Sequence, residues 1–159
     1  MATMYKKILA PVDGSPLSEY ILERVKALAT ECNVPEVILL RVVEPLSLYA
    51  ISALAQASGD LIEQAENENK AEARAYISEM VKKLTTEGIA AKGEIGNGKA
   101  DEQILAYAEK NKVDLIIMST HGRSGISRRF MGSVTDKVVR HSAVPVLVVT
   151  PPGCKGSSK

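Results

Sequence analysis

The residues best suited to chemistry lie in one late segment, "STHGRSGISRRFMGSVT" at positions 119–135. Gly122 and Gly125 allow backbone conformations in which successive N–H groups point into a concavity that can hold an anion. Gly132 and Ser133 follow where a helical pattern begins, and the N-terminus of a helix favours negative charge. Three arginines lie between these two ends: Arg123, Arg128 and Arg129. The segment favours phosphate binding; the alternative is a surface loop with solvated arginines before a capped helix.

A second candidate segment is "PVDGS" at residues 11–15, where an apolar run gives way to a helical pattern. Its carboxylate, Asp13, can contact a ligand, or it can satisfy nearby backbone N–H groups in an ordinary turn. Asp-Gly turns are common, so this segment taken alone favours the turn.

The sequence lacks two nucleotide-binding motifs. It has no G-x-x-x-x-G-K-[ST] and no G-x-G-x-x-G after its first apolar run, which argues against a P-loop NTPase and a dinucleotide-binding domain. His121 has no nucleophile beside it, so we expect it to contact a ligand or to hydrogen-bond rather than to catalyse. Only two cysteines, Cys32 and Cys154, and two histidines are present, so no metal site is predicted.

Composition predicts one ordinary globular domain: of 159 residues, 45% are hydrophobic and 25% are charged, with a formal net charge of +1. Proteins that bind nucleic acid or membrane surfaces normally carry a clear basic excess, so neither partner is expected. No run approaches the ~18 apolar residues of a membrane span, and no signal-peptide core is evident. We therefore expect a cytoplasmic protein.

Strands are predicted by four β-branched, nearly continuous apolar runs at residues 7–13, 36–44, 113–120 and 144–150. Such runs are typical of parallel strands that are buried on both faces. A weaker run at 89–96 alternates between apolar and polar residues and suggests an edge strand.

Helical patterns lie between the runs. One helix is predicted to continue to residue 32, with Ser15 as its N-cap and Pro16 as its first residue. A second helix is predicted over 60–87, with Gly88 at its C-terminal end. Further helices are expected over 101–112 and over 132–142, the latter opened by Ser133 and Asp136 as a variant capping box. The segment 45–59 is either a helical insertion or a mobile loop.

This alternation predicts an α/β fold, an open five-stranded parallel sheet with helices on both faces. Residues 1–150 form the expected domain, and 151–159 an expected disordered polar tail. Ligands in such sheets bind outside the carboxyl ends of the strands.

From about Tyr5 to Thr150, the chain resembles the universal stress protein family. The ATP-binding subgroup of that family carries G-x2-G-x9-G-[ST], and here Gly122 is followed by nine residues and then Gly132 and Ser133. Ser119 stands where the pattern has its first glycine. The resemblance implies a Rossmann-like sheet of the adenine nucleotide alpha hydrolase type, with strand order 3-2-1-4-5.

The resemblance also implies an ATP site, with Mg²⁺ or Mn²⁺ on the phosphates and no metal-binding residue. The nucleoside would contact residues 11–13, adenine would meet the backbone of Val42, and residues 118–122 would line the ribose and first phosphate. Backbone N–H groups of residues 132–134 would hold the outer phosphates. The implied ATP-binding residues are Pro11, Val12, Asp13, Val42, Met118, Ser119, His121, Gly122, Arg123, Gly125, Arg129, Gly132, Ser133, Val134 and Thr135.

The function that this implies is an ATP-binding stress-response or signalling protein with little or no hydrolysis, acting as a regulatory homodimer with an unidentified protein partner. Asp13 is the only candidate base, so at most a weak ATPase is expected. The alternative is a nucleotide-free dimeric interaction module, which Ser119 favours and Gly122, Gly132 and Ser133 oppose. The apolar run 144–150 would lie at a sheet edge, which invites pairing with a second copy.

Overall fold

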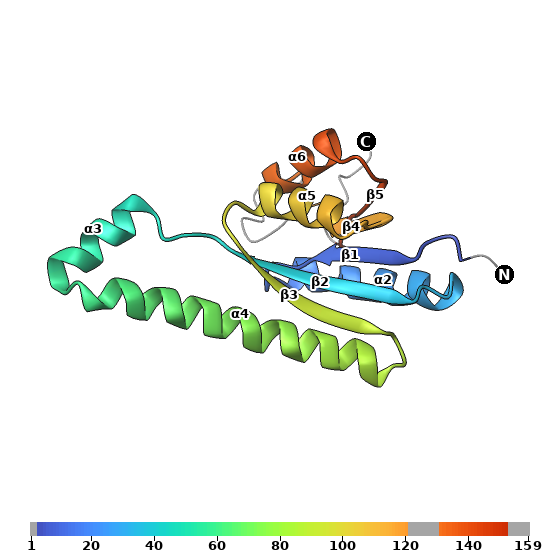
Figure 1. Cartoon of the computed structure of the whole chain (residues 1–159), viewed down its shortest axis with the longest axis horizontal. Helices are drawn as coiled ribbons and strands as arrows, with labels where there is room; N and C mark the ends of the chain where they lie inside the picture. Colours follow the sequence, from blue (N-terminus) through green and yellow to red (C-terminus); the bar gives the residue numbers. More distant parts are fainter. Residues whose placement is uncertain (1–2, 121–130, 153–159) are drawn as a thin grey trace.

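The computed structural model describes residues 3–120 and 131–152 of the chain. A five-stranded parallel sheet runs through it in the order β3-β2-β1-β4-β5 (Figure 1). Both the predicted strand order and the predicted edge position of the weak run are confirmed. The strands are β1 (Lys7–Pro11), β2 (Glu36–Val43), β3 (Ala91–Asn97), β4 (Leu115–Ser119) and β5 (Val146–Val149).

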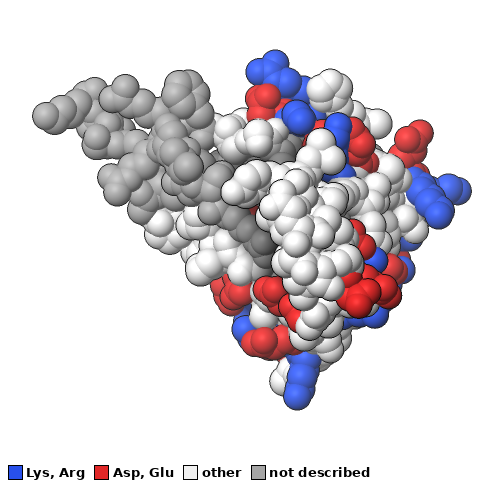
Figure 2. All heavy atoms as spheres, turned by 90° about the vertical axis from the view of Figure 1, so that its left-hand side faces the viewer, with Lys and Arg blue, Asp and Glu red and all other residues white. Residues whose placement is uncertain are grey.

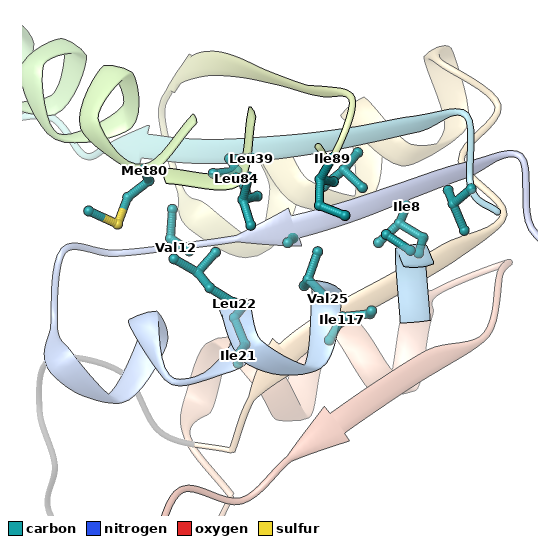
Figure 3. Packing of buried hydrophobic residues seen from close by; sticks show 14 of the residues in the cluster. Ile8, Val12, Ile21, Leu22, Val25, Leu39, Met80, Leu84, Ile89 and Ile117 are labelled. Atoms are coloured by element: carbon teal, nitrogen blue, oxygen red, sulfur yellow. The ribbon is translucent and has the colours of Figure 1, made fainter. Parts of the chain in front are cut away.

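Helices cover both faces of the sheet, as predicted. They are α1 (Pro16–Glu19), α2 (Ile21–Glu31), α3 (Leu48–Ala57), α4 (Asp60–Thr86), α5 (Ala100–Lys110) and α6 (Ser133–His141). On one face, α2 and α4 bury their apolar stripes against alternate residues of β1 and β2, as Figure 3 shows for Val25, Met80 and Leu84. On the other face, α5 and α6 pack against the intervening residues, such as Leu9 and Ile38.

The helix after β1 begins as the sequence predicts. Ser15 is the N-cap, its hydroxyl accepts the N–H of Ser18 at 3.1 Å, and Pro16 occupies the first turn. The predicted single helix is divided at Tyr20 into α1 and α2. Tyr20 nevertheless keeps right-handed helical angles, with φ −57° and ψ −27°, so the chain direction changes little there.

The end of α4 also follows the sequence. Gly88 has φ +84°, a conformation that favours glycine, and its N–H donates to the Thr85 carbonyl at 3.0 Å. The N–H of Ile89 donates to the Leu84 carbonyl at 3.0 Å. These two bonds form a Schellman motif, which gives hydrogen-bond donors to carbonyls of the last helical turn that would otherwise lack them.

The segment 45–59 contains a helix, so of the two alternatives the helical insertion is the one observed. α3 and the first half of α4 extend away from the sheet (Figure 1). The helix α3 has no buried residue, and Leu48 and Tyr49 are each 86% exposed. No helix in the described parts of the chain is long and apolar enough to cross a bilayer.

The predicted capping box at the start of α6 is wrong. Gly132 is the N-cap, its N–H donates to the Thr120 carbonyl at 2.7 Å, and no side chain caps the helix. That bond holds Gly132 outside the helix and makes Ser133 its first residue. Asp136 therefore lies one position too late to cap, and its carboxylate instead pairs with Arg140 at 3.0 Å.

The predicted polar tail falls almost wholly outside the described residues. Of its members, Pro151 is buried and Pro152 is exposed, and the remaining residues, 153–159, are not described.

Candidate functional site

A cavity of about 470 Å³ opens at the carboxyl ends of the strands, where β1 and β4 lie side by side. Successive connections leave these two strands in opposite directions, the place where open α/β sheets bind ligands. The volume lies within the range of small-molecule sites. Ten residues predicted for the ATP site line it: Pro11, Val12, Asp13, Val42, Met118, Ser119, Gly132, Ser133, Val134 and Thr135. Their contact with a nucleotide stays a prediction.

The turn after β1 shows the structural role considered for Asp13. Its carboxylate accepts the N–H of Ser15 at 2.9 Å, and its own N–H donates to the Ser18 hydroxyl at 3.1 Å. Gly14 has φ +83°, so a glycine is favoured at this point of the turn. Asp13 thus holds the turn and also lines the cavity.

The backbone of Val42 faces the cavity because of the strand register. The N–H of Val12 donates to the Leu40 carbonyl at 2.9 Å, so Leu40 points its peptide groups toward β1. Peptide groups alternate in direction along a strand, so the N–H and C=O of Val42 point the same way. The chain beyond Val12 turns at Gly14, which opens this edge of β2 to a ligand. Val43 points the other way, and its carbonyl accepts the N–H of Gly98.

The first turn of α6 forms the opposite side of the cavity. The first intrahelical bond runs from the N–H of Asp136 to the Gly132 carbonyl at 2.9 Å. The N–H groups of Ser133, Val134 and Thr135 therefore have no partner four residues back within the helix. These donors and the helix dipole make this side of the cavity attractive to an anion.

Ser119 is 6% exposed and belongs to β4, where it pairs with Val149 of β5. Within the described ranges, positive φ at a non-glycine residue occurs at Asn33 and Lys112 and not at Ser119. The backbone at position 119 is therefore one that any residue adopts, and it does not require the glycine that the family pattern has there.

A comparison with family models matches residues 4–150 to the universal stress protein family. The chain belongs to that family. It is 38% identical over 158 residues to universal stress protein MJ0577 of Methanocaldococcus jannaschii, covering 94% of this chain and 97% of the relative. The solved structure of MJ0577 matches with a TM-score of 0.81 at 35% identity, covering 94% of this chain and 99% of that one.

Two more distant solved structures share the fold. A universal stress protein in complex with cAMP matches with a TM-score of 0.66 at 22% identity, covering 92% of this chain and 97% of its own. A family protein from Arabidopsis thaliana with AMP bound matches with a TM-score of 0.62 at 17% identity, covering 93% of each chain.

In this universal stress protein, the cavity also has lining residues that sequence reasoning missed. The helix α4 contributes Asn69 and Glu72, and β2 and the chain just after it contribute Arg41 and Glu44. The three-residue spacing of Asn69 and Glu72 predicts a shared helix face. Nothing in the sequence says that this face meets the crevice. The other missed residues are Ser18, Leu40, Val43, Ala100 and Ile104.

Charge is unevenly distributed around the cavity. Its described lining includes the carboxylates of Asp13, Glu44 and Glu72 and the guanidinium of Arg41. Figure 2, a view from the end toward which the strands run, shows acidic side chains grouped beside an uncharged area. The N-terminus of α6 and the guanidinium of Arg41 are thus the anion-attracting features of the cavity wall among the residues that the structure describes.

One turn beyond Glu72, the hydroxyl of Tyr76 is buried and has no hydrogen-bond partner within the described residues. Burial, followed by the nearby Glu19 carboxylate, raises the pKa of Tyr76 to about 12. The phenol is therefore neutral at physiological pH.

Five predicted site residues lie outside the described residues: His121, Gly122, Arg123, Gly125 and Arg129. In the ranges 3–120 and 131–152, no group of three or more His, Cys, Asp or Glu side chains could hold a metal ion.

Proposed function

We propose that this chain is an ATP-binding stress-response protein with little or no hydrolysis, acting as a nucleotide-dependent regulatory homodimer. One observation carries the proposal. The open backbone edge of Val42 and the first-turn N–H groups of α6 face the same cavity, at the sheet position where nucleotides bind in this fold class.

The two sides of the cavity suit the two ends of a nucleotide. The N–H and C=O of Val42 offer a donor beside an acceptor, which matches N1 and the 6-amino group of adenine. The N–H groups of Ser133 and Val134 suit the outer phosphates. Asp13 lies between them on the cavity wall and suits the nucleoside. Mg²⁺ or Mn²⁺ would bind to the phosphates.

Distant relatives support an adenine nucleotide as the ligand. One is solved with cAMP and another with AMP. The family pattern at Gly122, Gly132 and Ser133 adds support, because it belongs to the ATP-binding subgroup. The extended backbone at Ser119 weakens the main argument for a nucleotide-free interaction module.

The expectation of slow turnover rests on Asp13, the one base that the sequence suggests, because this residue already has a structural role. The Asp13 carboxylate accepts the N–H of Ser15, and this hydrogen bond stabilises the turn after β1. The rate of ATP hydrolysis in an Asp13→Asn protein tests this point. A large loss of rate with unchanged ATP affinity would show an enzyme that uses Asp13, contrary to the proposal.

A pair of variants at Ser133 tests the phosphate side. Proline is tolerated at the first position of a helix, and Gly132 before it has φ −56° and ψ 150°, angles that suit a residue preceding proline. Ser133→Pro therefore removes one N–H and the hydroxyl while the helix is kept, and Ser133→Ala removes the hydroxyl alone.

We expect calorimetric titration with Mg·ATP to show about a tenfold weaker affinity in Ser133→Pro than in Ser133→Ala, the effect of one charge-assisted hydrogen bond. Equal affinities in the two variants would show that the N–H of residue 133 does not hold phosphate. If the wild type gives no heat at all, the nucleotide-free interaction module becomes the better account.

For the homodimer, the support comes from β5. It is an edge strand of apolar residues, and Leu147 is 40% exposed. An exposed apolar edge strand favours pairing with another strand. Two-fold pairing of β5 with β5 of a second copy covers this edge in both copies at once.

A further inference from the structure

The guanidinium of Arg41 lies at the edge of β2 that faces the cavity. Val37 and Leu39 direct their side chains to the face covered by α2 and α4, so alternation along β2 places Arg41 on that face too. From there its Nη1 donates to the carbonyl oxygen of Val42 at 3.2 Å, and Arg41 lines the cavity. The carbonyl proposed to accept the 6-amino group of adenine therefore already has a cationic donor beside it.

Three hydrogen-bonding groups therefore neighbour one another at this edge of β2: the N–H of Val42, its C=O, and the guanidinium N–H groups of Arg41. The first two match adenine, which presents an acceptor at N1 and a donor at its 6-amino group. The last two match a 6-oxopurine displaced by one position, whose N1–H would donate to the carbonyl and whose O6 would accept from Arg41. A carbonyl oxygen has two lone pairs, so the Arg41 bond leaves room for either purine.

We propose that Arg41 is a specificity-determining residue that allows the cavity to bind 6-oxopurine nucleotides, inosine nucleotides above all, in addition to adenine nucleotides. The proposal rests on the proposed function, because it places the base at Val42. It needs one N–H of the guanidinium to reach O6, whatever its other N–H groups contact. Guanine fits less well than hypoxanthine, because its 2-amino donor would meet the N–H donor of Val42.

The test compares Mg·ATP, Mg·ITP and Mg·GTP by calorimetric titration in the full-length wild type, Arg41→Met and Arg41→Lys. Methionine keeps a long unbranched chain without donors, and lysine keeps the charge as a single ammonium. Arg24→Met, on the exposed side of α2, is the matched control, and circular dichroism checks that each variant is folded.

In the wild type we expect ITP to bind within about tenfold of ATP and more tightly than GTP. In Arg41→Met, the ratio of the ITP Kd to the ATP Kd should rise about tenfold or more, the effect of losing one hydrogen bond to a charged group. In Arg41→Lys the ratio should lie between the values for the wild type and Arg41→Met, and in Arg24→Met it should equal the wild-type value.

Two results would overturn the inference. One is a wild type that rejects ITP by more than about a hundredfold relative to ATP; the other is the same ITP-to-ATP ratio in Arg41→Met and the wild type. In both cases ATP still binds, so the proposed function stands. A wild type that binds none of the three nucleotides would overturn the proposed function, and this inference with it.

Discussion

The hydroxyl of Thr135 donates to the carbonyl oxygen of Ser119 at 2.8 Å, and both residues are buried. This bond joins the first turn of α6 to the end of β4. A second bond runs from the N–H of Gly132, the N-cap of α6, to the carbonyl of Thr120, the residue after β4. Together they set the position of the helix N-terminus relative to the sheet, and hence the position of the proposed phosphate donors.

Replacing Thr135 by valine keeps the shape of the side chain and removes this donor. We expect a loss of about 1–2 kcal/mol in the free energy of unfolding, because a buried hydrogen bond is broken. ATP affinity should fall as well, since α6 loses one of its ties to β4. Urea denaturation and calorimetric titration measure the two effects. Thr135→Ser, which keeps the hydroxyl, is the control; if it loses as much ATP affinity as Thr135→Val, the hydrogen bond is not the cause.

Ser119→Gly restores the glycine of the family pattern. Because the backbone at 119 is extended and paired with β5, we expect ATP affinity to stay within about threefold of the wild type, while stability falls by roughly 0.5–1 kcal/mol. Parallel titration and urea denaturation of the two proteins test this. A gain of more than about tenfold in ATP affinity would mean that the serine side chain obstructs the nucleotide.

Sequence reasoning predicted the parts of the fold that depend on local pattern. The apolar runs became the five strands, Ser15 and Gly88 act at the helix ends as expected, and the family resemblance supplied the strand order. The capping box failed because a long-range bond, from Gly132 to Thr120, decides where α6 begins.

The cavity wall from α4 was missed for a similar reason. Asn69 and Glu72 show a helical spacing, but their place depends on how the long helix α4 lies across the sheet. Arg41 was missed because it reads as an ordinary charged residue within a strand. The role proposed for it depends on one contact with the neighbouring carbonyl, and no sequence pattern encodes that contact.

The buried hydroxyl of the half-buried Tyr76 predicts a specific sensitivity to alkaline pH. Its pKa is about 12 in the folded chain and about 10 when the chain is unfolded. Between these values the unfolded chain releases a proton that the folded chain retains, so the stability from this group is present below pH ~10 and is lost as the pH rises toward ~12.

Urea denaturation between pH 9 and 11.5 measures this effect, with Tyr76→Phe as the comparison; the range starts below the window of roughly 10–12 and covers most of it. We expect the wild type to lose stability more steeply than the variant. At neutral pH the variant should be as stable or more stable, because it removes a buried hydroxyl without a described partner. Identical pH slopes would contradict the assignment.

The edge strand β5 offers a direct test of assembly. The carbonyls of Pro145 and Val149 accept the N–H groups of Ile116 and Thr120, so alternation points the N–H of Val148 away from β4. Val148→Pro removes a donor that the folded chain does not need for its own sheet, and proline at an edge strand blocks further pairing.

Light scattering at micromolar concentration should show a dimer for the wild type and for Val148→Thr, and a monomer for Val148→Pro. A monomeric wild type would refute the homodimer. A dimeric Val148→Pro would locate the interface elsewhere on the molecule.

The most direct test of nucleotide binding is the small-molecule content of the protein itself. The chain is purified without added nucleotide, denatured, and the released molecules are identified by chromatography and mass spectrometry. We expect about one adenine nucleotide per chain, or, if the nucleotide dissociates during purification, saturable heat on titration with Mg·ATP. A protein that releases no nucleotide and gives no heat with Mg·ATP would contradict it.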